Sequence, residues 1–148
     1  MDALLTALVV WLATNFGLPA NFDHPRIEFV PATRMTALLQ EEIGQQKETA
    51  TSPTESDAEI VSLYNRDLKT VYLPDGWTGK TPAELSILVH EMVHHLQNLG
   101  GLKFACPQER EELAYKAQER WLKLFGHDLL SDFQMDPFTI LVKSHCFF

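Results

Sequence analysis

The sequence predicts an α+β fold that is mainly helical and contains a small antiparallel sheet. Apolar residues recur at helical spacing in several stretches that end at glycine or proline, which is typical of helices packed on a core. Two β-prone runs flank the turn-forming residues 65–67 and favour an antiparallel hairpin. The 148-residue chain is 45% hydrophobic, and two domains would leave each half too small to bury a sizeable core. We therefore expect one domain over residues 1–148.

The first expected element is a core helix in the apolar segment 3–13, which is too short for a membrane span of roughly 20 residues. Apolar residues continue at helical spacing to Phe16, and Gly17 and Pro19 end the pattern. The remnant of a secretory signal is the alternative, because signal peptides have apolar cores of about this length. Against it, no Lys or Arg precedes the segment and no small-residue cleavage site follows.

A short strand over residues 25–30 and a helix over residues 33–43 are expected next. Pro31 ends the strand, and Gly44 is expected to end the helix. The residues expected to face inward from this helix are Met35, Leu38, Leu39 and Ile43. Residues 45–57 hold many hydroxyl groups and no aliphatic side chain larger than Ala, which predicts a mobile loop. That loop either covers a site as a lid or is an ordinary solvated connection.

The expected hairpin covers residues 60–73, and a long helix follows it. Thr81 can cap this helix, Pro82 suits its first turn, and Glu84 completes a capping box. Gly100 is expected to end the helix, because glycine does not continue it cheaply.

A second long helix is expected from Pro107 to a stop at Gly126, with acidic residues in its first turn as the helix dipole favours. The tail over residues 127–148 should form one or two short helices, with Asp136 and Pro137 as a start signal. The three tryptophans, Trp11, Trp77 and Trp121, are expected in the core.

The helix that starts at Thr81 carries His90-Glu91-Met92-Val93-His94, an H-E-x-x-H motif. Residues four apart lie on one face of a helix, so His90 and His94 can aim their imidazoles at one point. Two neutral imidazoles are good zinc donors, but a catalytic site usually takes three protein ligands and keeps a fourth position for water. The motif places the Glu91 carboxylate beside that water. His95 points away from this face, so we expect it to pack in the core or to support a metal ligand rather than to bind metal. Gln97 either forms a hydrogen bond near His94 or is exposed.

With this motif, the sequence resembles the zincin metallopeptidases, and among them the gluzincins, above all their smallest bacterial members. The resemblance covers residues 64–124 and implies a third metal ligand, a glutamate on the following helix. Aligning the family's glutamate pattern makes Glu111 this ligand, with Glu112 and Glu109 as the alternatives. The departure is Tyr115, where gluzincins often have an aspartate that hydrogen-bonds a ligand histidine. A phenol is a weaker hydrogen-bond acceptor than a carboxylate. Either another group accepts the hydrogen bond from the ligand histidine, or this histidine is held less strongly in one tautomer.

The resemblance implies a zinc-dependent hydrolase of peptide or protein substrates, with His90, His94 and Glu111 as metal ligands and Glu91 as general base. Such enzymes bind substrate along a sheet edge, which residues 71–73 resemble, although an ordinary core hairpin is equally possible. They also stabilise the oxyanion with a side chain. The candidates here are Tyr115, Tyr64, Tyr72, His127 and His145. The alternative functions are a non-catalytic or weakly catalytic zinc-binding peptide-interaction module and a hydrolase of non-peptide bonds.

Charge and cysteine content restrict the partners and the location. The formal net charge of -8 argues against nucleic acid and anionic membranes as partners, because both attract clustered cations. Cys106 and Cys146, the only two cysteines, cannot form a zinc ribbon, but they can pair with each other or remain thiols. A disulfide would favour an oxidising compartment, so the sequence leans toward an extracytoplasmic location, periplasmic or secreted.

Overall fold

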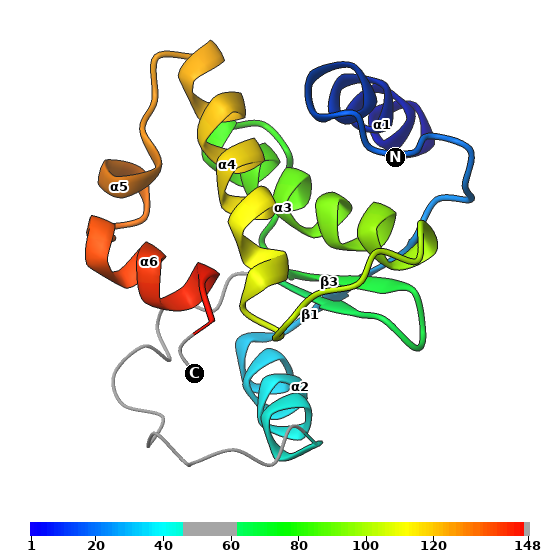
Figure 1. Ribbon diagram of the computed structural model, residues 1–148, viewed down its shortest axis with the longest axis vertical. Coiled ribbons are helices and arrows are strands. Elements are labelled where there is room, and N and C mark those ends of the chain that lie inside the picture. The colour runs from blue at the N-terminus through cyan, green and yellow to red at the C-terminus, as the bar shows by residue number, and fades with distance from the viewer. Residues whose placement is uncertain (46–61, 147–148) are drawn as a thin grey trace.

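The computed structural model describes residues 1–45 and 62–146, and within these ranges the fold is α+β and mainly helical, as predicted (Figure 1). The helices are α1 (Asp2–Phe16), α2 (Ala32–Gln45), α3 (Pro82–Leu99), α4 (Glu109–Leu124), α5 (Leu129–Asp132) and α6 (Pro137–Ser144). The strands are β1 (Arg26–Val30), β2 (Leu63–Asn65) and β3 (Thr70–Pro74). The loop predicted at residues 45–57 lies outside the described residues apart from Gln45, the last residue of α2.

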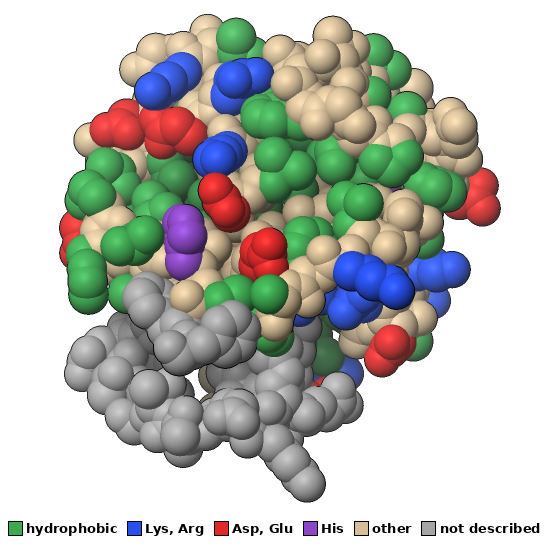
Figure 2. Space-filling model, viewed as in Figure 1, with side chains coloured by type: hydrophobic (Ala, Val, Ile, Leu, Met, Phe, Trp, Pro, Cys, Tyr) green, Lys and Arg blue, Asp and Glu red, His purple; other side chains and the backbone are tan. Residues whose placement is uncertain are grey.

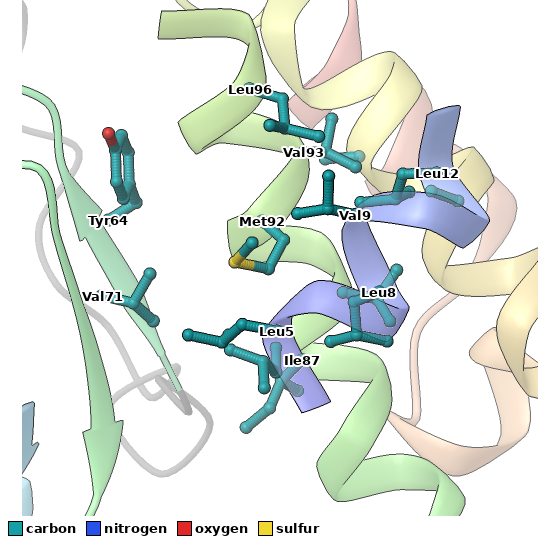
Figure 3. Close-up of a cluster of buried hydrophobic side chains, with 14 of the residues drawn as sticks. Leu5, Leu8, Val9, Leu12, Tyr64, Val71, Ile87, Met92, Val93 and Leu96 are labelled. Carbon is teal, nitrogen blue, oxygen red and sulfur yellow. The ribbon is translucent and has the colours of Figure 1, made fainter. Parts of the chain in front are cut away.

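The main core lies on two sides of α3. Figure 3 shows side chains of α3, such as Met92 and Val93, between the sheet residues Tyr64 and Val71 and the α1 residue Leu8. The buried residues of α1 are Leu5, Leu8, Val9 and Leu12, so the predicted N-terminal core helix is confirmed. A smaller cluster on the sheet consists of Val30 and Tyr72 from the strands and Met35 and Leu38 from α2. With α1 and the sheet on two sides of α3, the face that carries the histidines turns toward α4.

The sheet has the order β1–β3–β2, and β3 is its central, buried strand. The predicted antiparallel hairpin is confirmed, since β2 pairs antiparallel with β3. However, β1 pairs parallel with β3, so the sheet is mixed rather than wholly antiparallel. The chain passes through α2 between β1 and the hairpin, and such a crossover allows two strands to point the same way. Of the two alternatives for residues 71–73, the core hairpin is confirmed and the sheet edge is wrong, because β3 has a partner on each side.

Local signals set most helix ends. Gly17 caps α1 with a positive φ of 66°, and the Thr81 hydroxyl accepts from the Glu84 N–H at the start of α3, as predicted. Gly44 does not end α2, which runs on to Gln45. One glycine costs a helix about 1 kcal/mol without forcing it to stop, so this expectation was wrong.

The C-terminal helices pack beside α4, on the side away from α1 (Figure 1). The predicted start signal at Asp136 is confirmed, because its carboxylate accepts from the Thr139 N–H at 2.7 Å and begins α6. A disulfide joins Cys106, ahead of α4, to Cys146, after α6, with the two Cα atoms 5.9 Å apart. None of the helices in the described part of the chain has both the length and the apolar character to cross a membrane.

Candidate metal centre

Three side chains of α3 form a group that could hold a metal ion. One ligand atom from each of His90, Glu91 and His94 lies within 4.8 Å of the others. The helix brings them together because residues four apart share a face and Glu91 follows the first of them. The Glu91 side chain is only 5% exposed, and its Oε2 accepts a hydrogen bond from the Ser62 hydroxyl at 2.6 Å. Two imidazoles and a buried carboxylate thus converge, as the motif predicts.

Glu111 reaches this group from α4. Its Oε2 lies 2.8 Å from His90 Nε2, and its Oε1 lies 3.1 Å from His94 Nε2. The two alternatives point elsewhere: Glu112 pairs with Lys116 at 3.0 Å, and Glu109 accepts from the Ala105 N–H at 2.5 Å. Of the three glutamates considered, Glu111 is therefore the one that the packing of α4 on α3 brings to the histidines.

The charges at this point perturb each other. Burial alone lowers the pKa of His90, but the charge and hydrogen bond of Glu111 outweigh it and raise this pKa to about 9. Burial likewise raises the pKa of Glu111, yet the nearby His94 and His90 hold it well below the ordinary carboxyl range. Glu111 is therefore ionised at neutral pH, as a carboxylate that binds a cation must be.

Each histidine also contacts a glutamine on the side away from Glu111. His90 Nδ1 lies 2.9 Å from Gln118 Oε1, and His94 Nδ1 lies 3.1 Å from Gln97 Oε1. Gln97 was considered from its spacing to His94, whereas no role was predicted for Gln118. Gln118 lies seven residues after Glu111, and this helical spacing, which puts both on one face of α4, is the signal that could have found it.

His95 is buried and plays the packing role expected of it. Its Nε2 lies 2.7 Å from the Asp23 carbonyl oxygen, and its Nδ1 lies 2.8 Å from the Tyr64 hydroxyl. The Tyr64 hydroxyl also accepts from Asn98 Nδ2 at 3.1 Å. This network joins α3 to β2 and to the segment before β1, and it uses both hydrogen-bonding capacities of Tyr64.

Of the oxyanion candidates, Tyr115 has a free hydroxyl at the site. Its ring stands edge-on to His90, with 4.8 Å between the ring centroids. Its hydroxyl makes no hydrogen bond within the described residues, and burial, followed by the charges of Glu111 and Glu91, raises the pKa of this phenol. Tyr72 is buried in the smaller cluster on the sheet, and neither His127 nor His145 lines the cavity described next.

A cavity of about 960 Å³ lies in front of these groups. Its polar lining residues from α3 and α4 include Glu91 and Tyr115. Its apolar lining includes Leu102, Phe104, Leu129, Phe133 and Val142. Figure 2 shows hydrophobic side chains gathered over α5 and α6, the helices that supply two of these lining residues. An apolar cavity with a few convergent polar groups is the usual form of a small-molecule or peptide site.

The family model of a domain of unknown function (DUF6647) matches residues 1–147, and the chain belongs to this family. No curated protein and no solved structure matches the chain.

Proposed function

We propose that this member of the DUF6647 family is a zinc-dependent peptidase of the gluzincin type, with His90, His94 and Glu111 as metal ligands and Glu91 as general base. The observation that carries the proposal is the convergence of both Nε2 atoms on the Glu111 carboxylate, at 2.8 and 3.1 Å, with Glu91 alongside. A purely structural zinc site has no use for a buried base and is usually closed by four protein ligands.

The donor set fits zinc. Two imidazole nitrogens and one carboxylate are the ligands of catalytic zinc sites that keep a fourth position open. When bound, a zinc ion supplies Lewis acidity, which lowers the pKa of water toward neutrality and polarises a carbonyl group. The ionised Glu111 and the two Nε2 atoms would hold such an ion, and Glu91 would remain available for chemistry.

Glu91 acts as the proton carrier of the reaction. Ser62 holds its Oε2, while no described residue hydrogen-bonds Oε1, which can accept a proton from the attacking water. The water oxygen bonds to the peptide carbonyl carbon while the C=O π electrons move to the oxygen as an oxyanion. The carbonyl then re-forms as the C–N bond breaks, and Glu91 passes the proton to the leaving amine. In this proposal the Tyr115 hydroxyl, which stays protonated, donates to the oxyanion.

A peptide substrate fits the edge strand β2. This strand pairs with β3 on one side only among the described strands, and Ser62 and Tyr64 line the cavity beside Glu91. A peptide added along such an edge gains main-chain hydrogen bonds, while its side chains enter the neighbouring apolar cavity. In this proposal β2, rather than residues 71–73, is the strand along which the substrate binds.

The proposal is tested by measuring metal content and turnover together. We expect one zinc ion per chain in the wild type, in Glu91→Gln and in the matched control Glu112→Gln, and loss of zinc in Glu111→Gln. Glu91→Gln should lose roughly 10²- to 10⁴-fold in kcat, measured as new amines released from a casein digest, because the general base is gone.

The outcomes separate the two parts of the proposal. No zinc in the wild type, even after zinc is added back, would contradict the metal centre. Zinc binding without measurable peptide cleavage would favour the peptide-interaction module instead. Zinc binding with undiminished cleavage by Glu91→Gln would contradict the role of Glu91.

A further inference from the structure

We propose that Gln97 and Gln118 are positioning residues of the metal centre: each accepts the Nδ1–H of one histidine, so that Nε2 is the nitrogen left to bind the ion. This inference rests on the proposed metal binding by His90 and His94. It adds the two residues that occupy the role for which gluzincins often use a carboxylate.

The hydrogen-bond chain behind His90 has only one consistent direction. It ends at the Ala83 carbonyl, which can only accept and takes the Ser86 hydroxyl proton at 2.7 Å. Ser86 Oγ must then accept from Gln118 Nε2, which lies 3.2 Å away. The other end of the amide, Oε1, therefore faces His90 Nδ1 at 2.9 Å, and Nδ1 has to be the donor.

The chain behind His94 has the same direction. The carbonyl oxygen of Arg110 accepts from Gln97 Nε2 at 3.2 Å, so Gln97 also turns its Oε1 toward the imidazole. His94 Nδ1 lies 3.1 Å from this oxygen and must donate to it. Two separate chains, each anchored on a backbone carbonyl, thus present Nε2 of both histidines toward Glu111.

Burial makes these orientations hard to reverse. Gln97 and Gln118 are only 2% and 4% exposed, and a flipped amide would set a buried amide oxygen against another acceptor, the Arg110 carbonyl oxygen or Ser86 Oγ. An amide oxygen also accepts the Nδ1–H without adding a charge behind the ligand. Within the described residues, the negative charges that act on His90 are then those of Glu111 and Glu91.

The test is the zinc affinity of Gln118 variants, measured by competition with a chromophoric chelator. Gln118→Met keeps the volume but removes the acceptor, so its Kd for zinc should rise about 10- to 100-fold. Gln118→Glu keeps an acceptor oxygen, toward which the Ser86 hydroxyl can rotate, so it should bind zinc at least as tightly as the wild type. If Gln118 only packed, Gln118→Met should bind zinc more tightly than Gln118→Glu, because methionine fills the space without a polar group while the glutamate buries a charge.

A second pair of variants tests the anchor of the chain. Ser86→Ala releases the amide of Gln118 and should weaken zinc binding, although Ser86 is not itself a ligand. Ser144→Ala is the matched control: Ser144 is also buried and donates to a carbonyl of its own helix, at 2.6 Å from Ile140, but it does not line the cavity.

The two proposals fail in different ways. If Gln118→Met keeps the wild-type Kd, or ranks above Gln118→Glu, the positioning role is wrong while the metal centre stands. If the wild type binds no zinc, the proposed function is wrong and this inference falls with it. A thermal unfolding curve for each variant separates lost affinity from lost structure.

Discussion

Tyr115 illustrates how one residue changes the chemistry available at a site. A carboxylate at this position would accept a hydrogen bond from one of the two histidines, but a phenol beside the Glu111 and Glu91 carboxylates keeps its proton. Gln118 takes over the contact with His90 Nδ1. The Tyr115 hydroxyl, which has no hydrogen-bond partner within the described residues, is therefore left as a donor for the proposed oxyanion.

We therefore expect Tyr115→Phe to lower kcat by about 10²- to 10³-fold, the usual effect of losing one oxyanion donor, with zinc content unchanged. Peptide cleavage kinetics and metal analysis measure the two quantities. Tyr64→Phe is the matched control, because it loses a hydroxyl that is engaged with His95 and Asn98 and should reduce stability rather than kcat. Equal kcat in Tyr115→Phe and the wild type would remove Tyr115 from the mechanism.

At the scale of the element, α3 depends on the capping group at its N-terminus. Glu84 accepts from the Thr78 N–H at 2.6 Å and from the Thr78 hydroxyl at 2.8 Å, while Thr81 accepts from the Glu84 N–H at 3.1 Å. The hydrogen bond from the Thr78 N–H, together with those from the Thr78 and Thr81 hydroxyls, lowers the pKa of Glu84 below its ordinary value of 4.5. The helix that carries the motif thus begins at a charge-dependent cap.

This cap predicts a pH effect. Because the folded-state pKa of Glu84 is lowered, its stabilisation is present above pH 4.5 and is lost as the pH falls through the folded-state value. In urea unfolding, the wild type should lose more stability between neutral pH and pH below 4.5 than Glu84→Gln, whose amide does not titrate. Thr81→Ala should instead cost about 1 kcal/mol at neutral pH and retain the acid dependence. Parallel pH curves for the wild type and Glu84→Gln would contradict this account.

Elements were predictable where their signals are local. The spacing of His90 and His94, the box at Thr81 and the restart at Asp136 each involve residues within one helical turn or so, and the structure has all three. The parallel partner of β1 and the contact between His90 and Gln118 join distant segments. Their geometry depends on how β1, α3 and α4 pack. Helical spacing puts Gln118 on the same face of α4 as Glu111, but it does not show which atom of α3 Gln118 meets. Glu111 was reached only through the resemblance.

At the scale of the whole molecule, the site exists only while α4 stays packed on α3, because the two helices contribute opposite halves of it. Helix α4 is in turn covered by α5 and α6, which also supply the apolar lining of the cavity. The disulfide between Cys106 and Cys146 ties the two ends of this segment together across 40 residues. The disulfide therefore limits the conformations that the segment from Cys106 to Cys146 can adopt in the unfolded chain. This is the segment that must pack on α3 again when the chain folds.

Removing this restraint should destabilise the molecule without changing the ligands. We expect the double variant Cys106→Ser/Cys146→Ser to lose roughly 2–4 kcal/mol of unfolding free energy, since a loop of this length gains much entropy when it opens. Urea unfolding with and without reductant measures the loss: reductant should lower the stability of the wild type and leave the double variant unchanged. Zinc content should remain near one per chain at low urea, because His90, His94 and Glu111 are held by helix packing. A double variant as stable as the wild type would show that the native segment docks on α3 without covalent help.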